Sequence, residues 1–386
     1  MYKLTTLKNG VRVVTQYISH VNHTSAGLYI GSGSFDETRK NNGVAHFLEH
    51  LVIEQGHLSG AGQKLLELGY PGTAYTTYDH TAYQFLVPGR YLTLAVRALA
   101  TMVKDENYSN ALLTQERATV LAEYDNHCAD LASVQEEVIK RALFPKGRLG
   151  LNPIGTEKNI RTMPLSFMQA FKRRHYVSEN MVLVAVGRVK HEHMVKLAEK
   201  HFGDLPQQAK PEAHSPSSLV TGKSHTVDFP SRRVQLNVLL AWERKGGEDD
   251  AVLLWTHILH TRLYKRLREQ LHLIYNVEVE VIDHDDYTAV HISTPVRPED
   301  YKTALKEVKA VVKATAAGVS LSEFQAAQNT AILKIRDRAR TLTETMDALA
   351  GAQLDDTSYQ TVAEEINDLH GVTLRQLHKV ARRVVR

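Results

Sequence analysis

Two histidines and a glutamate in the run His-Phe-Leu-Glu-His, residues 46–50, have the types and spacing of a metal site. Histidines four residues apart on a helix lie on adjacent turns, with side chains about 6 Å apart, so both rings can bind one ion. The intervening Glu49 lies beside them and can reach water bound to that ion. The alternative interpretation is a polar helix face that meets only water.

The residues around this run predict an amphipathic helix. Apolar side chains recur at three- and four-residue intervals and form one stripe, which consists of Val44, Phe47, Leu48, Leu51 and Val52. His46, Glu49 and His50 fall on the opposite side of the helix. Since the stripe is the face that should meet the core, we predict that these histidines are not residues of the apolar core held by internal hydrogen bonds.

A catalytic zinc ion commonly has three protein ligands and one open position, so the two histidines need a third partner. The helical pattern that begins near Leu112 contains Glu116 and Glu123, which lie on one face two turns apart. We interpret Glu123 as the third ligand and Glu116 as a residue that contacts a ligand rather than the metal and helps to orient it. The alternative is that both glutamates face solvent on a long helix.

The segment that contains these histidines, residues 31–56, resembles the zinc-binding region of the pitrilysin family, also called the insulinase superfamily. In that family a His-x-x-Glu-His motif is followed further along the chain by a pair of glutamates, and the second of them binds zinc. The separation of His50 and Glu123 matches. The resemblance implies one zinc ion per chain and the following roles: His46, His50 and Glu123 as ligands, Glu49 as general base, and Glu116 as the supporting residue.

The resemblance extends over nearly the whole chain and implies further site residues. The segment 262–277 is similar to a family motif in which an arginine and a tyrosine reach the active site from the opposing domain, which implies this role for Arg268 and Tyr275. Thr73 and Ala74 occupy the position where the family often has an Asn-Ala pair that holds the substrate. A peptide substrate is then expected to add a strand to the sheet edge at this point.

The chain's own pattern predicts an α+β fold in two successive blocks, each with strands first and helices after. We predict an N-terminal domain over residues 1–206, a linker over 207–225 and a C-terminal domain over 226–386. The linker is predicted because this segment is rich in Pro, Ser, Lys and Gln. The resemblance implies two homologous domains, each a mostly antiparallel sheet packed with helices, which together form half of a clamshell.

Composition excludes several other classes of protein. The 386-residue chain is 43% hydrophobic, and its 47 basic and 43 acidic residues are interspersed with a net charge of +4, which does not indicate nucleic-acid binding. No apolar run is long enough for a membrane span, and the first residues lack the apolar core of a secretory signal. A single cysteine, Cys128, excludes an intrachain disulfide. We therefore expect a cytoplasmic protein without nucleic-acid or membrane partners.

The His-x-x-Glu-His motif, together with what the family resemblance implies, predicts a zinc-dependent endopeptidase in which Glu49 activates a zinc-bound water. The resemblance implies a dimeric chamber that admits unfolded peptides or small polypeptides. A homodimer is the first choice, because the ligand set and the Arg/Tyr pair occur in one chain, and a heterodimer with a homologous chain is the alternative. The corresponding alternative function is a non-catalytic or partner-dependent subunit of a heterodimeric processing peptidase that binds peptides.

Overall fold

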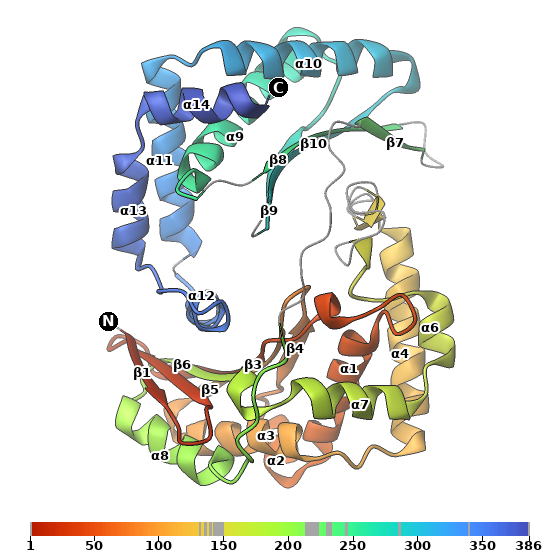
Figure 1. Cartoon of the computed structure of the whole chain (residues 1–386), viewed down its shortest axis with the longest axis vertical. Coiled ribbons are helices and arrows are strands. Elements are labelled where there is room, and N and C mark those ends of the chain that lie inside the picture. The colour runs from red at the N-terminus through yellow and green to blue at the C-terminus, as the bar shows by residue number, and fades with distance from the viewer. Residues whose placement is uncertain are drawn as a thin grey trace. The chain divides into compact units, whose positions relative to one another are not determined.

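The computed structural model describes residues 2–130, 133–134, 137–138, 141, 150–212, 224–228, 234–243, 246–284, 287–338 and 340–384. The chain forms two compact units (Figure 1). The first unit comprises residues 1–137, 147–215 and 339–359, and the second comprises residues 138–146, 216–338 and 360–386. Most of the predicted linker, residues 213–223, lies outside the described residues.

A six-stranded sheet forms the centre of the first unit. Its strand order is β1-β2-β6-β3-β5-β4, and every pair is antiparallel except the parallel pair β2 and β6. The strand β4 is therefore an edge, paired among the described strands with β5 alone. The bounds are Tyr2–Thr6 (β1), Arg12–Tyr17 (β2), His23–Ile30 (β3), Thr73–Thr76 (β4), Thr81–Pro88 (β5) and Met181–Gly187 (β6).

Helices cover both faces of this sheet. Alternate strand residues point to opposite faces: Val13 and Leu28 pack with α1, α3 and α8, whereas Val14 and Tyr29 pack with α12. The helices are α1 (Val44–Leu58), α2 (Gly60–Glu67), α3 (Leu92–Lys104), α4 (Asn110–Ala129), α6 (Glu157–Thr162), α7 (Leu165–His175), α8 (His191–Phe202) and α12 (Leu342–Leu354), with short 3-10 turns η1 (Ser34–Asp36), η2 (Gly89–Tyr91) and η4 (Ser178–Asn180).

The helix α12 joins the first unit although it lies late in the sequence. Its buried residues Met346, Leu349 and Ala350 cover the second apolar face of the sheet. The predicted C-terminal domain, residues 226–386, therefore differs from the second unit, which lacks residues 339–359 and also includes 138–146 and 216–225. The physical reason is that β6 is apolar and buried along its whole length, so both of its faces need a covering layer.

The second unit contains a four-stranded antiparallel sheet in the order β7-β8-β10-β9, so each unit has the mostly antiparallel sheet that was predicted. Among the described residues, no helix has the length and apolar character needed to cross a bilayer. The elements are β7 (Ser224–Asp228), β8 (Val234–Glu243), α9 (Asp249–Leu263), the π-helix η5 (Tyr264–Gln270), β9 (Glu278–His284), β10 (Tyr287–Val296), η6 (Pro298–Asp300), α10 (Tyr301–Ala317), α11 (Leu321–Arg338), α13 (Val362–Gly371) and α14 (Leu374–Val384).

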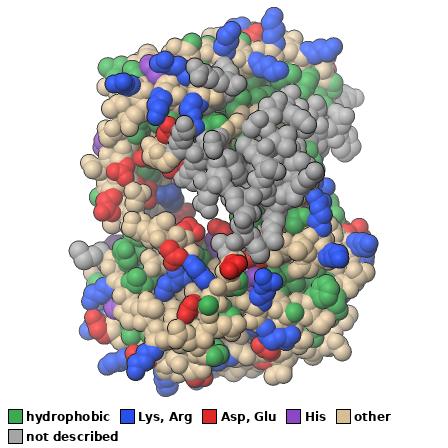
Figure 2. All heavy atoms as spheres, in the orientation of Figure 1, with side chains coloured by type: hydrophobic (Ala, Val, Ile, Leu, Met, Phe, Trp, Pro, Cys, Tyr) green, Lys and Arg blue, Asp and Glu red, His purple; other side chains and the backbone are tan. Residues whose placement is uncertain are grey.

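Charged side chains are interspersed on the surface. On the face drawn in Figure 2, basic and acidic side chains occur close together over the described residues. This agrees with the alternation of the two signs along the sequence. The expectation that nucleic acid is not a partner stays a prediction.

Candidate metal centre

The first turn of α1 is fixed by a buried glutamate from outside the helix. Gly43, at the N-terminal cap, has no side chain to satisfy the first amides of the helix. The Glu37 carboxylate does so instead, because it accepts hydrogen bonds from the backbone N–H groups of Gly43 and Ala45, each at 2.8 Å. Asn42 Nδ2 donates a third bond at 2.8 Å. Burial raises the pKa of Glu37 to about 8, although these three donors act to lower it.

Two glycines allow the chain to approach this turn closely. Gly43 has a φ of 95°, and a Cβ atom placed on it would lie 2.9 Å from the Cα of Gly155. Gly155 has a φ of 88° and would meet the carbonyl oxygen of Asn42 at 2.7 Å. A side chain at either position would strain the backbone and displace its neighbour. The start of α1 is therefore locked against the loop that precedes α6.

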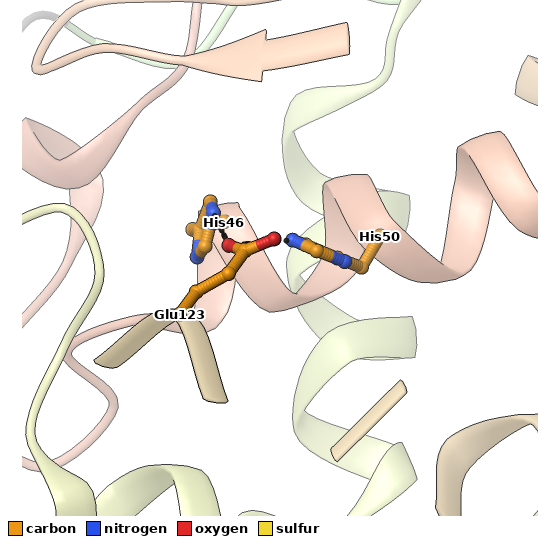
Figure 3. A group of neighbouring side chains, drawn as sticks. All are labelled: His46, His50 and Glu123. Atoms are coloured by element: carbon orange, nitrogen blue, oxygen red, sulfur yellow. Dashed lines mark ion pairs between the residues drawn. The ribbon is translucent and has the colours of Figure 1, made fainter. Parts of the chain in front are cut away.

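The structure brings the three predicted ligands together (Figure 3). His46 and His50 project from α1 toward Glu123, which comes from α4. The carboxylate oxygen Oε2 of Glu123 lies 3.5 Å from Nε2 of His46 and 3.3 Å from Nε2 of His50. Both rings are largely buried, whereas the Glu123 side chain is 44% exposed. The cluster is thus open to solvent on the side of Glu123.

Two of the distances between these ligand atoms match those of a zinc site. Zinc takes imidazole nitrogens and carboxylate oxygens at about 2.0–2.1 Å with tetrahedral angles, so two ligand atoms in such a site lie about 3.4 Å apart. The two distances between the imidazole nitrogens and the Glu123 oxygen, 3.5 and 3.3 Å, are close to this value. The ligand atoms all lie within 4.8 Å of one another. The donor set and its spacing therefore suit zinc.

Glu116 contacts His50 on the side away from Glu123. Its side chain is only 3% exposed, and its Oε2 lies 3.3 Å from Nδ1 of His50. The Gln115 side chain donates to the other oxygen at 3.1 Å. In the neutral form of the ring, a proton held at Nδ1 by this contact leaves Nε2 as the nitrogen that can bind a metal. This placement allows the supporting role predicted for Glu116, which stays a prediction.

Burial and neighbouring charges set the protonation of the two histidines. Burial lowers the pKa of His46 to about 4, with the charge of His50 acting in the same direction and that of Glu123 opposing it. Burial would also lower the pKa of His50, but the hydrogen bond to Glu123 and the charges of Glu49 and Glu123 raise it to about 9. At neutral pH a metal ion would therefore find His46 neutral and would displace a proton from His50.

Glu49 is a buried carboxyl group beside the three ligands. It is 5% exposed, and the hydroxyl of Thr76 on β4 donates to its Oε2 at 3.0 Å. Burial raises the pKa of Glu49 to about 7, although the charge of His50 and the bond from Thr76 act to lower it. A carboxyl group with this pKa can both take and give a proton near neutral pH.

Thr73 and Ala74, the predicted substrate-binding pair, lie on β4. They pair with Gln84 and Tyr83 of β5. The other edge of β4 has no strand partner among the described residues. Such an edge presents backbone N–H and C=O groups on which an added strand can pair. The position thus allows the predicted contact, which stays a prediction.

Arg268 and Tyr275 contact each other within the second unit. Arg268, on the π-helix η5, donates a hydrogen bond from Nη1 to the carbonyl oxygen of Tyr275, and its Cζ lies 4.4 Å from the centre of the Tyr275 ring. The Tyr275 side chain remains 70% exposed. The predicted pair is thus assembled, and its predicted action at the metal centre is a separate proposal.

Two family models match successive parts of the chain. The model described as "Insulinase (Peptidase family M16)" matches residues 12–157, and the model described as "Peptidase M16 inactive domain" matches residues 164–331. The first match contains all three candidate ligands, Glu49 and Glu116. The second contains Arg268 and Tyr275.

Similar proteins carry related names. An "uncharacterized zinc protease" of Mycobacterium tuberculosis is 27% identical, over 99% of this chain and 90% of its own length. The beta subunit of the mitochondrial-processing peptidase of Blastocladiella emersonii is 32% identical, over 53% of this chain and 45% of its own. A crystal structure of a protease from Helicobacter pylori superposes with a TM-score of 0.88 at 17% identity, covering 100% of this chain and 97% of the other. This structural likeness confirms the predicted α+β fold.

Proposed function

Because the chain belongs to the insulinase family, peptidase family M16, we propose that it is a zinc-dependent endopeptidase. The observation that carries the proposal is the convergence of His46, His50 and Glu123 on one point. The buried carboxyl group of Glu49 lies beside them with a pKa of about 7. A donor set of two histidines and a carboxylate next to a general base is an arrangement that zinc-dependent peptide hydrolysis uses.

The proposed chemistry divides between the ligands and Glu49. His46, His50 and Glu123 would hold zinc, which supplies a Lewis acid that polarises a peptide carbonyl and makes water more acidic. Thr76 donates a hydrogen bond to Oε2 of Glu49, and we assign to the other oxygen, Oε1, the proton of the attacking water. The same oxygen then gives the proton to the leaving amine. A pKa of about 7 suits both transfers at neutral pH.

We further propose that the substrate is an unfolded peptide or small polypeptide in extended conformation. It would pair with the open edge of β4, where backbone groups of Thr73 and Ala74 hold it in register. The exposed hydroxyl of Tyr275 and the guanidinium of Arg268 would donate hydrogen bonds to the carbonyl oxygen as charge develops on it.

A homodimeric chamber is the proposed assembly, since one chain supplies both the ligand set and the Arg/Tyr pair. Light scattering of the purified chain should then give twice the mass of 43.4 kDa. A monomer that becomes active only when a homologous chain is added would instead support the partner-dependent alternative. A cytoplasmic location stays a prediction.

The test compares Glu49→Gln with the unmutated chain and with Glu54→Gln. Glu54 lies on the same helix and contacts His57 rather than the site, so it is a matched control. All three proteins should bind about one zinc ion per chain. Only Glu49→Gln should fail to cleave a quenched fluorescent peptide.

Two outcomes would contradict the proposal. If the unmutated chain binds no zinc, the assignment of His46, His50 and Glu123 as ligands is wrong. If it binds zinc but cleaves nothing in a broad peptide library, a partner-dependent subunit becomes the better account.

A further inference from the structure

One carboxylate oxygen on α12 links three strands of the first sheet. Oδ1 of Asp347 accepts hydrogen bonds from the Tyr75 hydroxyl of β4 at 2.8 Å and from Gln84 Nε2 of β5 at 2.7 Å. It also accepts a short hydrogen bond from the hydroxyl of Tyr29 on β3. Gln84 in turn donates to the Tyr29 hydroxyl at 2.8 Å. These contacts connect α12 to the sheet edge formed by β4.

Neighbouring residues of β4 connect this network to the metal centre. Because side chains alternate along a strand, Tyr75 and Thr76 point to opposite faces of the sheet. Tyr75 contacts Asp347 on the face covered by α12, whereas Thr76 contacts Glu49 on the face covered by α1. The backbone between the two side chains is a single peptide unit, so a displacement of Tyr75 also displaces Thr76.

The strand β4 is a short strand at the edge of the sheet. It has four residues, pairs with β5 alone among the described strands, and its side chains are all partly or fully exposed. A short edge strand of this kind opens readily unless side chains hold it. The hydrogen bond to Asp347 therefore acts together with the pairing to β5, the packing of Ala74 and the bond from Thr76 to Glu49 in keeping β4 in place.

We infer that Asp347 is a positioning residue for the active site, which acts through β4 to hold Thr76 against Glu49 and to keep the substrate-binding edge in register. This inference rests on the proposed peptidase function. It assigns to α12, far from the ligands in the sequence, a role beyond covering apolar surface. Asp347 itself contacts neither Glu49 nor a ligand.

The inference predicts different effects for two substitutions of Asp347. Alanine removes the acceptor oxygen. Three donors then lose this partner, namely the hydroxyls of Tyr29 and Tyr75 and the side-chain amide of Gln84. Asparagine keeps one acceptor oxygen of the same reach. Asp347→Ala should lower kcat about tenfold, and Asp347→Asn should recover most of that loss, with zinc content unchanged in both.

Met346→Ala is the matched control. Met346 precedes Asp347 on α12, is fully buried, and packs over Gly27 of β3. Its truncation should lower the melting temperature at least as much as Asp347→Ala, because it leaves a cavity beneath the helix. Well below that melting temperature, Met346→Ala should retain kcat within about twofold, since β4 remains held.

Amide hydrogen exchange gives a readout that does not require activity. The exchange of β4 amides should be at least about tenfold faster in Asp347→Ala than in Met346→Ala. Equal exchange in the two variants, or an unchanged kcat in Asp347→Ala, would overturn the positioning role. If the unmutated chain cleaves no peptide, the proposed function fails, and the exchange of β4 still decides whether Asp347 holds this strand.

Discussion

At the scale of single residues, the environment of Glu49 makes the stability of the metal-free protein depend on pH. Burial raises its pKa from 4.5 to about 7. Below pH 4 the folded and unfolded states both hold the proton, whereas above pH 7 both have lost it and the folded state carries a buried charge. The free energy of unfolding should therefore fall as the pH rises through this window, by about 3 kcal/mol from this residue alone.

Glu49→Gln should remove this loss, because the amide has nearly the same shape and does not ionise. Urea denaturation in the presence of a chelator measures this effect. As the pH rises from 4 to 8, the free energy of unfolding of the variant should increase by about 3 kcal/mol relative to that of the unmutated chain. Glu54→Gln, with a side chain 38% exposed, provides the comparison and should follow the unmutated chain closely. Parallel stability curves for Glu49→Gln and the unmutated chain would show that Glu49 ionises normally.

The sequence predicted those residues of the candidate metal centre that lie one turn apart on a single helix, because that spacing can be recognised without a structure. His46 and His50 are four positions apart on α1, and the structure places both beside Glu123. The sequence contained no such signal for Thr76 or Asp347. Thr76 contacts Glu49, and Asp347 contacts Tyr75, only because β4 packs against helices from other parts of the chain. Contacts of that kind depend on tertiary structure and leave no local pattern.

At the scale of elements, the start of α1 depends on Glu37, which lies seven residues before the helix. The usual capping patterns place the capping side chain at the helix boundary or three residues into the helix. The sequence therefore predicted α1 from its apolar stripe but gave no reason to single out Glu37. The parallel pairing of β2 with β6 was also missed, since these strands are far apart in the sequence.

Glu37→Ala should destabilise the protein and weaken zinc binding together. The substitution leaves the buried amides of Gly43 and Ala45 without an acceptor, which should cost about 2–3 kcal/mol in the free energy of unfolding. Because His46 lies in the same turn, zinc affinity should fall at least about tenfold. Urea denaturation and competition with a fluorescent chelator measure the two effects.

Glu67→Ala is the control for this substitution. Glu67 is exposed on α2 and pairs only with Lys64 at 3.3 Å among the described residues, so its removal should change stability by less than about 0.5 kcal/mol. Glu37→Gln should lie between the two, since it keeps one acceptor oxygen. If Glu37→Ala is destabilised but binds zinc with normal affinity, then capping of α1 by Glu37 does not affect the metal centre.

At the scale of the whole molecule, the two units do not follow two continuous halves of the sequence. The segment that contains α12 belongs to the first unit, although most residues of the second unit precede it in the sequence. The sequence contained one indication of this arrangement. The strand β6 is apolar at every position rather than at alternate ones, which predicts a sheet covered on both faces. The apolar pattern of β6 does not indicate which later segment of the chain packs on the second face of the sheet.

In the second unit, Arg268 contacts an exposed tyrosine, Tyr275. The guanidinium of Arg268 lies 5.2 Å from the ring centre of Tyr264 and 4.4 Å from that of Tyr275. Tyr275 is nevertheless 70% exposed, so its hydroxyl is available to a ligand. An exposed tyrosine that is fixed by a cation at its face costs little in conformational freedom when it meets a substrate.

Tyr275→Phe should therefore lower kcat about 100-fold if the hydroxyl donates to the developing oxyanion, while zinc content and melting temperature stay unchanged. The ring and its contact with Arg268 remain in this variant, so only the hydroxyl is tested. Arg268→Ala should show a loss of similar size, because it removes the cation that holds the ring. Arg266→Ala is the control, since Arg266 lies on the same π-helix but pairs with Glu307 at 2.7 Å. Unchanged kcat in Tyr275→Phe would remove this tyrosine from the mechanism and leave Glu49 as the single tested proton carrier.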